Sequence, residues 1–257
     1  MRASGIRRIA VIGAGLMGHG TALEFAAHGY DIRLHDREQT QRARARDSIA
    51  EGLGRHVEIG RITSATAAAT PDHITLSTDL RSTVANADLV IESVFEDLDV
   101  KREVFRDLDG VTPPHVILAS NTSTFLPSLL AVATRRPDRV LAAHYFYPPY
   151  LLPLVELVRG KQTSDVTVAT MSALYRAIGK RPAVVKKEAP GFVANRLQMA
   201  FFREAFPSWP LASPVRKMST SLSRLASGAN LDLLVPSSSL IPVDSTSSSL
   251  SASNSSR

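Results

Sequence analysis

The chain has 257 residues, of which 44% are apolar, and a formal net charge of +6. It contains no cysteine, which excludes disulfides, thiol catalysis and zinc–thiolate sites. No apolar run reaches the roughly 20 residues of a membrane span, and no basic run is interleaved with aromatic residues, so neither a membrane nor a nucleic acid is expected as a partner. The first expected strand begins at Ile6 and leaves no room for a targeting segment, so we expect a cytoplasmic protein.

Short apolar runs alternate with amphipathic stretches as far as Phe206. The runs expected to form strands are Ile6–Gly13, Asp31–Asp36, His73–Ser77, Ala87–Ser93, His115–Ser120 and Arg139–Phe146. The stretches expected to form helices are Met17–His28, Glu38–Gly52, Val100–Leu108 and Thr167–Ile178. Such alternation predicts an α/β fold with a doubly wound, Rossmann-like parallel sheet, covered by helices on both faces.

The first strand leads into a glycine-rich turn with the pattern G-x-G-x-x-G. Gly13 permits a tight turn, Gly15 lets the backbone approach a pyrophosphate, and Gly18 lets helix and strand pack closely. The helix that follows begins with Leu16 and Met17 and offers free N–H groups to phosphates. A glycine-rich bend without a ligand is the alternative, but a turn between a strand and a helix favours a dinucleotide cofactor.

An acidic residue, Asp36, ends the second expected strand. Its carboxylate is suited to accept hydrogen bonds from both hydroxyls of the adenosine ribose, which favours NAD over NADP. Arg37 follows immediately and could contact a 2′-phosphate. The expected cofactor is NAD, and a comparison of NAD and NADP binding tests it.

Three further segments carry chemistry: SNTST (Ser120–Thr124), HYFYPPYLLPLVELV (His144–Val158) and APGFVANRLQ (Ala189–Gln198). With the glycine turn, they resemble the L-3-hydroxyacyl-CoA dehydrogenase family, including its lambda-crystallin and L-gulonate dehydrogenase branch, over about residues 5–205. The resemblance implies hydride transfer between NAD and the 3-hydroxy or 3-keto carbon of an acyl-CoA. It implies no metal ion.

The resemblance also assigns roles to individual residues. His144 would move the hydroxyl proton, and Glu156 would hold its imidazole. Ser123 and Asn195 would hold the reacting oxygen. The residues that would line the nicotinamide end of the cofactor are Glu96, Lys101, Asn121 and Ser123. From the residues alone, each also has a structural reading, such as a helix cap for Ser123 or a satisfied structural histidine for His144.

One position departs from the family pattern, because Tyr147 stands where the family usually has an asparagine. A phenol offers one hydroxyl in place of the donors and acceptor of an amide, which leaves the substrate open. The alternatives are a dehydrogenase of a free hydroxy acid such as L-gulonate, a non-catalytic crystallin-like NAD-binding protein, and a pseudogene product.

The resemblance divides the chain into three parts. Residues 1–188 would form the NAD-binding domain, and residues 189–206 would begin the helical domain through which the family dimerises and completes its cleft. Residues 207–257 are rich in serine and are expected to be disordered, or frameshifted, since serine codons read out of frame encode apolar residues. We therefore expect impaired catalysis and an uncovered apolar face near the truncated helix, which would expose some combination of Phe192, Leu197, Met199, Phe201 and Phe202.

Overall fold

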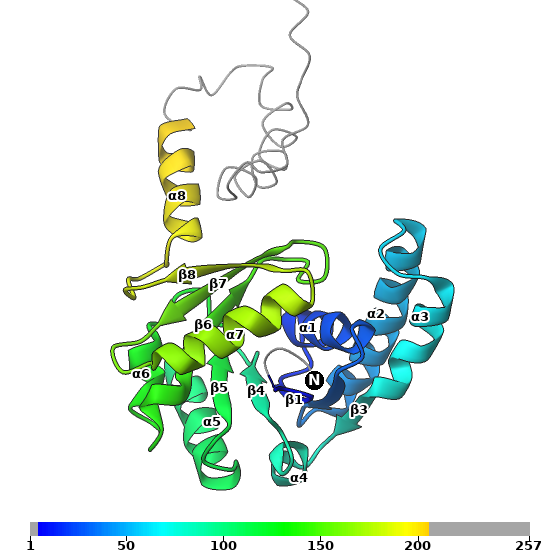
Figure 1. Ribbon diagram of the computed structural model, residues 1–257, viewed down its shortest axis with the longest axis horizontal. Coiled ribbons are helices and arrows are strands. Elements are labelled where there is room, and N and C mark those ends of the chain that lie inside the picture. The colour runs from blue at the N-terminus through cyan, green and yellow to red at the C-terminus, as the bar shows by residue number, and fades with distance from the viewer. Residues whose placement is uncertain (1–4, 206–257) are drawn as a thin grey trace, which may run out of the picture. The chain divides into compact units, whose positions relative to one another are not determined.

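The computed structural model of the chain describes residues 5–205, and the expected tail, 207–257, lies outside them. The described part contains a sheet of eight strands in the order β3-β2-β1-β4-β5-β6-β7-β8 (Figure 1). The strands are β1 (Arg8–Ile12), β2 (Asp31–His35), β3 (Ile74–Ser77), β4 (Leu89–Glu92), β5 (Ile117–Ser120), β6 (Val140–Tyr145), β7 (Leu154–Arg159) and β8 (Arg181–Val185). The predicted α/β, doubly wound class is confirmed.

Helices connect the strands and cover both faces of the sheet (Figure 1). They are α1 (Leu16–Ala27), α2 (Gln39–Glu58), α3 (Ser64–Ala69), α4 (Leu80–Val84), α5 (Leu98–Val111), α6 (Pro127–Ala131) and α7 (Asp165–Ala177). A further helix, α8 (Ala194–Ala205), follows the last strand. Two 3₁₀ turns, Thr70–His73 and Pro137–Arg139, precede β3 and β6. The helices α2 and α5 extend beyond the predicted ranges at their C-termini. Two caps set N-terminal bounds: the Asp97 carboxylate accepts Asp99 N–H and Val100 N–H at α5, and Ser164 accepts Thr167 N–H at α7.

The sheet is not parallel throughout, which corrects the sequence prediction. Strands β1 to β6 run parallel, but β7 pairs antiparallel with β6 and places Glu156 opposite His144. Strand β8 then runs parallel to β7. The connection between β6 and β7 covers only residues 146–153. A parallel crossover needs about a dozen residues or more, so this short connection returns the chain antiparallel.

The strands alternate their side chains between two apolar cores. Ile9 and Val11 of β1 face a core that includes α1, α2 and α7, whereas Ala10 and Ile12 face one that includes α4, α5 and α6. Both faces of the central strands are therefore buried, as a near-continuous apolar strand predicts. The carboxyl ends of the strands are left to carry polar side chains at one edge of the sheet.

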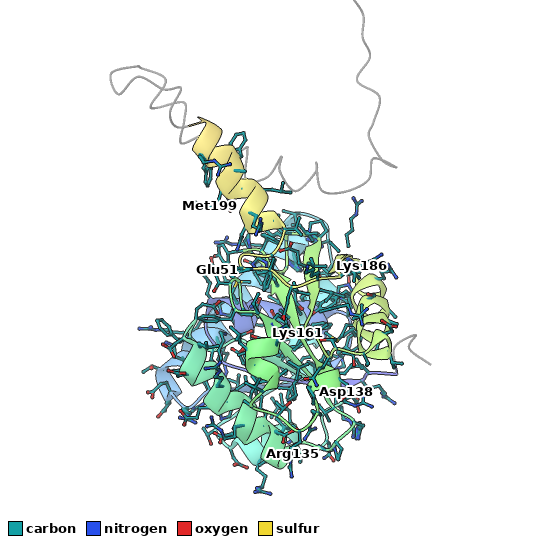
Figure 2. The ribbon with its side chains drawn as sticks, turned by 90° about the vertical axis from the view of Figure 1, so that its left-hand side faces the viewer. Glu51, Arg135, Asp138, Lys161, Lys186 and Met199 are labelled. Carbon is teal, nitrogen blue, oxygen red and sulfur yellow. The ribbon has the colours of Figure 1, made fainter. Side chains whose placement is uncertain are left out.

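Helix α8 exposes much of its apolar surface. Leu197, Met199 and Phe201 are 47%, 64% and 45% exposed, and Figure 2 labels Met199 on this helix. Phe202 is half-buried. Phe192 is not part of the exposed set, because this side chain is only 1% exposed and packs against Ala142 of β6 and Val158 of β7. Among the described residues, no helix is long and apolar enough to cross a membrane.

Candidate active site

The glycine turn has the shape that a dinucleotide requires. A methyl group on Gly13 would lie 2.6 Å from the Ser93 carbonyl oxygen, and one on Gly18 only 1.8 Å from the Gly13 carbonyl oxygen. Gly13 also has a φ of 98°, which favours glycine. At Gly15 the corresponding position meets nothing within 4 Å, so the backbone there is open to a ligand.

The N-terminus of α1 is also free of side-chain caps. Gly15 occupies the N-cap position, no side chain hydrogen-bonds there, and the first turn holds no acidic residue. The leading N–H groups of a helix and its dipole attract anions. The residues present therefore fit the pyrophosphate of a dinucleotide.

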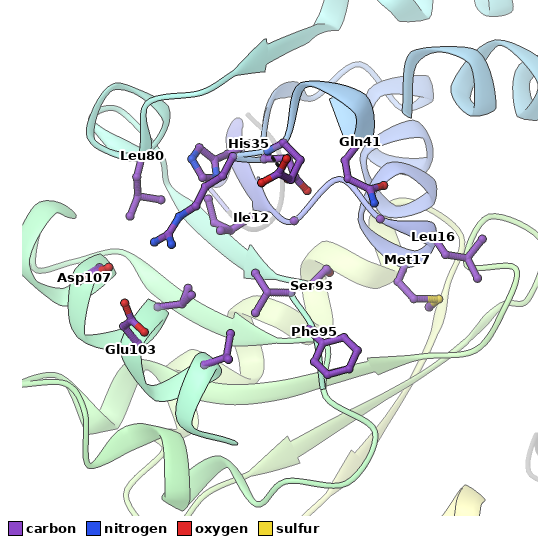
Figure 3. A pocket seen from close by; sticks show the side chains of 18 residues that line it. Ile12, Leu16, Met17, His35, Gln41, Leu80, Ser93, Phe95, Glu103 and Asp107 are labelled. Carbon is purple, nitrogen blue, oxygen red and sulfur yellow. Dashed lines mark hydrogen bonds between the residues drawn. The ribbon is translucent and has the colours of Figure 1, made fainter. Parts of the chain in front are cut away.

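A cleft of about 560 Å³ extends from this turn toward the end of β2 (Figure 3). Figure 3 shows Leu16 and Met17 at one side of the cleft, and Glu103 and Asp107 at the other. Of the predicted cofactor residues, the cleft is lined by Gly13, Gly15, Leu16, Met17 and Asp36. Gly18 lies behind the turn, where it permits the close packing of α1.

Asp36 has a second function in the fold. Its Oδ2 accepts the N–H of Ala14 at 2.8 Å, and its Oδ1 accepts the N–H of Glu38 at 2.9 Å. The carboxylate therefore ties the glycine turn to the end of β2. Arg42 donates to the carbonyl oxygen of Asp36 at 2.6 Å, which steadies the same loop.

An ionic cluster lies at the carboxyl end of β4, and we call its three residues the acidic triad: Glu92, Lys101 and Glu96. Lys101 Nζ donates to Glu92 Oε1 at 2.7 Å and lies 3.2 Å from Glu96 Oε2. The side chains of Lys101 and Glu92 are almost fully buried. The remaining contacts of Glu92 are with Val94 N–H at 2.7 Å and Ser120 Oγ at 2.6 Å.

Glu96 binds the SNTST loop. Its Oε1 accepts Thr122 Oγ1 at 2.5 Å, Ser123 N–H at 3.0 Å and Thr124 Oγ1 at 3.0 Å. Burial opposes ionisation of this carboxyl, but the hydrogen bond from Thr122, the positive charge of Lys101 and the hydrogen bond from Thr124 outweigh it and lower the pKa of Glu96. Glu96 is therefore a carboxylate at neutral pH.

Asn121 and Asn195 connect this loop to the rest of the site. Asn121 Nδ2 lies 3.4 Å from Ser93 Oγ, and its Oδ1 accepts the N–H of Tyr145 at 3.2 Å. Asn195, in the first turn of α8, donates from Nδ2 to the carbonyl oxygen of Ser123 at 3.2 Å. The structure thus brings Glu96, Lys101, Ser123 and Asn195 into one connected group, with Asn121 beside it.

The predicted histidine–carboxylate pair is formed. His144 Nδ1 and Glu156 Oε2 lie 2.8 Å apart, and both side chains are buried. The other oxygen of Glu156 accepts the N–H groups of Val193 and Ala194, at 3.0 and 2.9 Å. One carboxylate therefore holds the imidazole and the beginning of α8 together. Tyr147, the departure from the family pattern, is 57% exposed, and the pair forms without being displaced by it.

Two aromatic side chains enclose the imidazole. The ring of Phe146 lies 4.6 Å from that of His144, and the ring of Phe192 lies 5.6 Å away in an edge contact, centre to centre. Phe192 has a φ of 51°, a left-handed conformation that is uncommon for a residue other than glycine. This conformation turns Phe192 under β6 and β7 and gives His144 an apolar wall.

The sequence analysis missed several residues of the site. Glu92 lies inside an apolar run, and only its polarity in such a run signals a buried partner. Ser120 lies at the end of a strand, and nothing in its residue type indicates its contact with the buried Glu92. Phe192 was assigned to a surface, because nothing in its own residue type indicates a left-handed backbone.

Comparison with known proteins agrees with this geometry. Residues 8–189 match the model of a family described as "3-hydroxyacyl-CoA dehydrogenase, NAD binding domain". An L-carnitine dehydrogenase of Streptomyces coelicolor is 38% identical over 200 residues, which are 78% of this chain and 62% of that protein. A fatty acid oxidation complex subunit alpha of Pseudomonas putida is 39% identical over 77% of this chain and 27% of its own length.

Solved structures give the same result. An (S)-3-hydroxybutyryl-CoA dehydrogenase from Ralstonia eutropha aligns with a TM-score of 0.77 and 36% identity, over 82% of this chain and 75% of that one. The matched region spans 62% or less of the L-carnitine dehydrogenases it resembles. The relatives matched across this region are dehydrogenases, and the matching family model is that of an NAD-binding domain, which confirms the predicted cofactor. The chain belongs to the 3-hydroxyacyl-CoA dehydrogenase family and carries its NAD-binding domain.

Proposed function

We propose that the chain carries the cofactor site and the proton-transfer pair of a dehydrogenase that interconverts a 3-hydroxyacyl-CoA and its 3-keto form. The observation that carries the proposal is the buried contact of 2.8 Å between His144 Nδ1 and Glu156 Oε2. A buried carboxylate can only accept, so it fixes the tautomer in which Nδ1 carries the proton. Nε2 is then left to accept or return the substrate proton.

His144 acts as the general base in the oxidative direction. Its Nε2 takes the hydroxyl proton, and Glu156 stabilises the imidazolium that forms. The apolar wall formed by Phe146 and Phe192 keeps water away from this charge. In the reductive direction, the same Nε2 returns the proton to the carbonyl oxygen.

The cofactor site provides the other half of the reaction. NAD, when bound, accepts the hydride from the alcohol carbon. The glycine turn and the N-terminus of α1 would hold the pyrophosphate, and Asp36 the adenosine ribose. Glu96, Lys101 and Asn121 would line the nicotinamide end, whereas Ser123 and Asn195 would hold the reacting oxygen. The link from Asn195 Nδ2 to the carbonyl oxygen of Ser123 supports this joint role.

A free 3-hydroxy acid is the second candidate substrate. L-carnitine dehydrogenases are among the relatives, at 36–38% identity. The exposed Tyr147, which stands where the family usually has an asparagine, also favours a changed substrate. L-gulonate, which the resemblance indicates, belongs to the same class of free hydroxy acids.

Turnover measurements with several substrates separate these candidates. The full 257-residue chain is mixed with NADH and acetoacetyl-CoA, or with NAD⁺ and either L-carnitine or L-gulonate, and absorbance of NADH is followed. The proposal predicts the highest kcat/KM with acetoacetyl-CoA. A higher value with either free hydroxy acid overturns the acyl-CoA assignment. NAD binding without turnover on any of them is the result expected of impaired catalysis, and a crystallin-like role predicts that result even with a complete helical domain.

The domain organisation is part of the same proposal. We assign residues 1–188 to the NAD-binding domain and residues 189–206 to the start of a helical domain. The exposed Leu197, Met199 and Phe201 on α8 support an additional apolar surface that packs against this helix. Dimerisation through such a helical domain is what the resemblance to the family implies.

A further inference from the structure

The acidic triad carries a net negative charge. Glu92 is contacted by the N–H of Val94 and the ammonium of Lys101, which can only donate, and by the hydroxyl of Ser120. That pattern belongs to an ionised carboxylate. Glu96 is ionised as well, since its pKa is lowered. Two carboxylates and one ammonium group therefore sum to a charge of −1.

The place of the triad in the sheet puts this charge near the reactive ring of the cofactor. The adenosine end belongs at Asp36 after β2, and the pyrophosphate at the turn after β1. The proton-transferring His144 lies on β6. Because the ring must lie between the pyrophosphate and His144, it passes over the carboxyl ends of β4 and β5, where the triad sits. This step rests on the proposed function.

We propose that the acidic triad sets the relative affinity of the site for the two redox forms of the cofactor, with Glu92 as a specificity-determining residue that does not touch the cofactor. The nicotinamide ring carries a positive charge in NAD⁺ and none in NADH. A net charge of −1 close to the ring therefore lowers the Kd of NAD⁺ relative to that of NADH. Glu92 is fully buried, so it acts through charge and through the position of Lys101.

Glu92→Gln removes the charge while preserving the shape of the side chain. The amide oxygen can still accept from Val94 N–H and Lys101, and the Ser120 hydroxyl can accept from the amide nitrogen. NADH is titrated by its fluorescence into the full chain, and NAD⁺ is titrated as its competitor. We expect the ratio of Kd for NAD⁺ to Kd for NADH to rise roughly fivefold in Glu92→Gln, the size expected for one charge across a partly polar interior.

A matched control removes a hydrogen bond from the same carboxylate without changing charge. Ser120→Ala deletes the 2.6 Å contact with Glu92 Oε2. If the role of Glu92 is only structural, this variant and Glu92→Gln change both Kd values together and leave their ratio unchanged. The proposal instead expects the ratio of Kd for NAD⁺ to Kd for NADH to stay unchanged in Ser120→Ala and to rise in Glu92→Gln.

Glu96→Gln gives a second test that does not depend on the buried pair. Its side chain is 38% exposed, and the substitution leaves the contact between Lys101 and Glu92 in place. It removes the same charge and must shift the ratio in the same direction. An unchanged ratio in the folded Gln variants overturns the inference. A wild-type chain that binds neither nucleotide overturns the proposed function itself, so the two failures are distinguishable.

Discussion

Glu156 accepts the backbone N–H of Ala194 at 2.9 Å with one oxygen, while its other oxygen holds His144 at 2.8 Å. The start of α8 and the imidazole of His144, the proposed general base, therefore depend on the same buried carboxylate. A carboxylate at a helix N-terminus is also favoured by the helix dipole. One side chain thus links the position of His144 to the position of α8.

Glu156→Gln removes the negative charge beside His144 and keeps the size of the side chain that holds the start of α8. Glutamine can keep one acceptor for the N–H groups of α8, but it no longer stabilises an imidazolium on His144. We expect turnover to fall by about 10²-fold or more, with the Kd for NADH unchanged. Steady-state kinetics and NADH fluorescence measure the two quantities. Equal losses of turnover and of NADH affinity would show that the residue only supports the fold.

Two glycines of the turn are expected to respond oppositely to the same substitution. Gly15→Ala meets no atom within 4 Å, so the free energy of unfolding should change by less than about 1 kcal/mol, whereas NAD affinity falls about tenfold because the methyl group occupies the approach to the pyrophosphate. Thermal unfolding and NAD titration of this variant measure both effects.

Gly18→Ala serves as the partner experiment. Its methyl group would lie 1.8 Å from the Gly13 carbonyl oxygen, so α1 must move away from β1. We expect a loss of about 2 kcal/mol or more of unfolding free energy. If Gly18→Ala were as stable as the wild type, the close packing of helix and strand described above would be wrong.

The charge of Asp36 predicts discrimination between NAD and NADP. A 2′-phosphate would meet this carboxylate, so we expect NADP to bind roughly tenfold more weakly than NAD. Asp36→Asn removes the repulsion and keeps an acceptor for only one of the two N–H groups of Ala14 and Glu38, and it should narrow the difference between the Kd values of NAD and NADP. Parallel titrations with both dinucleotides provide the test. Equal affinities in the wild-type chain would mean that Arg37 compensates for the carboxylate.

His56 makes the fold sensitive to acid. The residue is 2% exposed, and neither ring nitrogen has a hydrogen-bond partner among the described residues. Burial, with the positive charges of Arg61 and Lys180, lowers the pKa of His56 to about 4. Between about pH 6.5 and pH 4 the unfolded chain therefore binds a proton that the folded chain rejects, and stability falls as the pH falls.

The expected loss across this window is on the order of 3 kcal/mol. The ring centres of His56 and Tyr150 lie 5.1 Å apart. His56→Phe keeps an aromatic ring in this contact, and the new side chain cannot be protonated. Urea unfolding of both proteins at pH 7 and pH 4.5 gives the difference. The variant should lose distinctly less stability than the wild type, and parallel losses would assign the acid sensitivity to other groups.

Much of the sheet could be predicted from the sequence because its parallel strands are buried on both faces. Runs such as Ala87–Ser93 read as apolar without any knowledge of their neighbours. The antiparallel return of β7 could not be predicted with the same ease, since it depends on the short 146–153 connection. The short connection forces β7 to return antiparallel, whereas the apolar composition of a strand does not indicate its direction.

The residues of the site also differ in how well the sequence predicts them. The glycine turn and Asp36 were predictable because local spacing and chemistry carry them, whereas the pair of His144 and Glu156 was expected from the resemblance to the family, since the two residues meet only across the antiparallel strands β6 and β7. Glu92 was not, because its function depends on an ammonium group contributed by the next helix. Phe192 was not, because a left-handed backbone after Gly191 turns it inward.

The most direct test of the central claim compares the full chain with its His144→Gln variant. NADH binding is measured first and should be the same in both, since the cofactor site lies on other residues. Oxidation of bound NADH by acetoacetyl-CoA should then be about 10²–10⁴-fold slower in the variant. If His144→Gln oxidises NADH as fast as the wild-type chain, the buried pair of His144 and Glu156 is not the proton-transfer group.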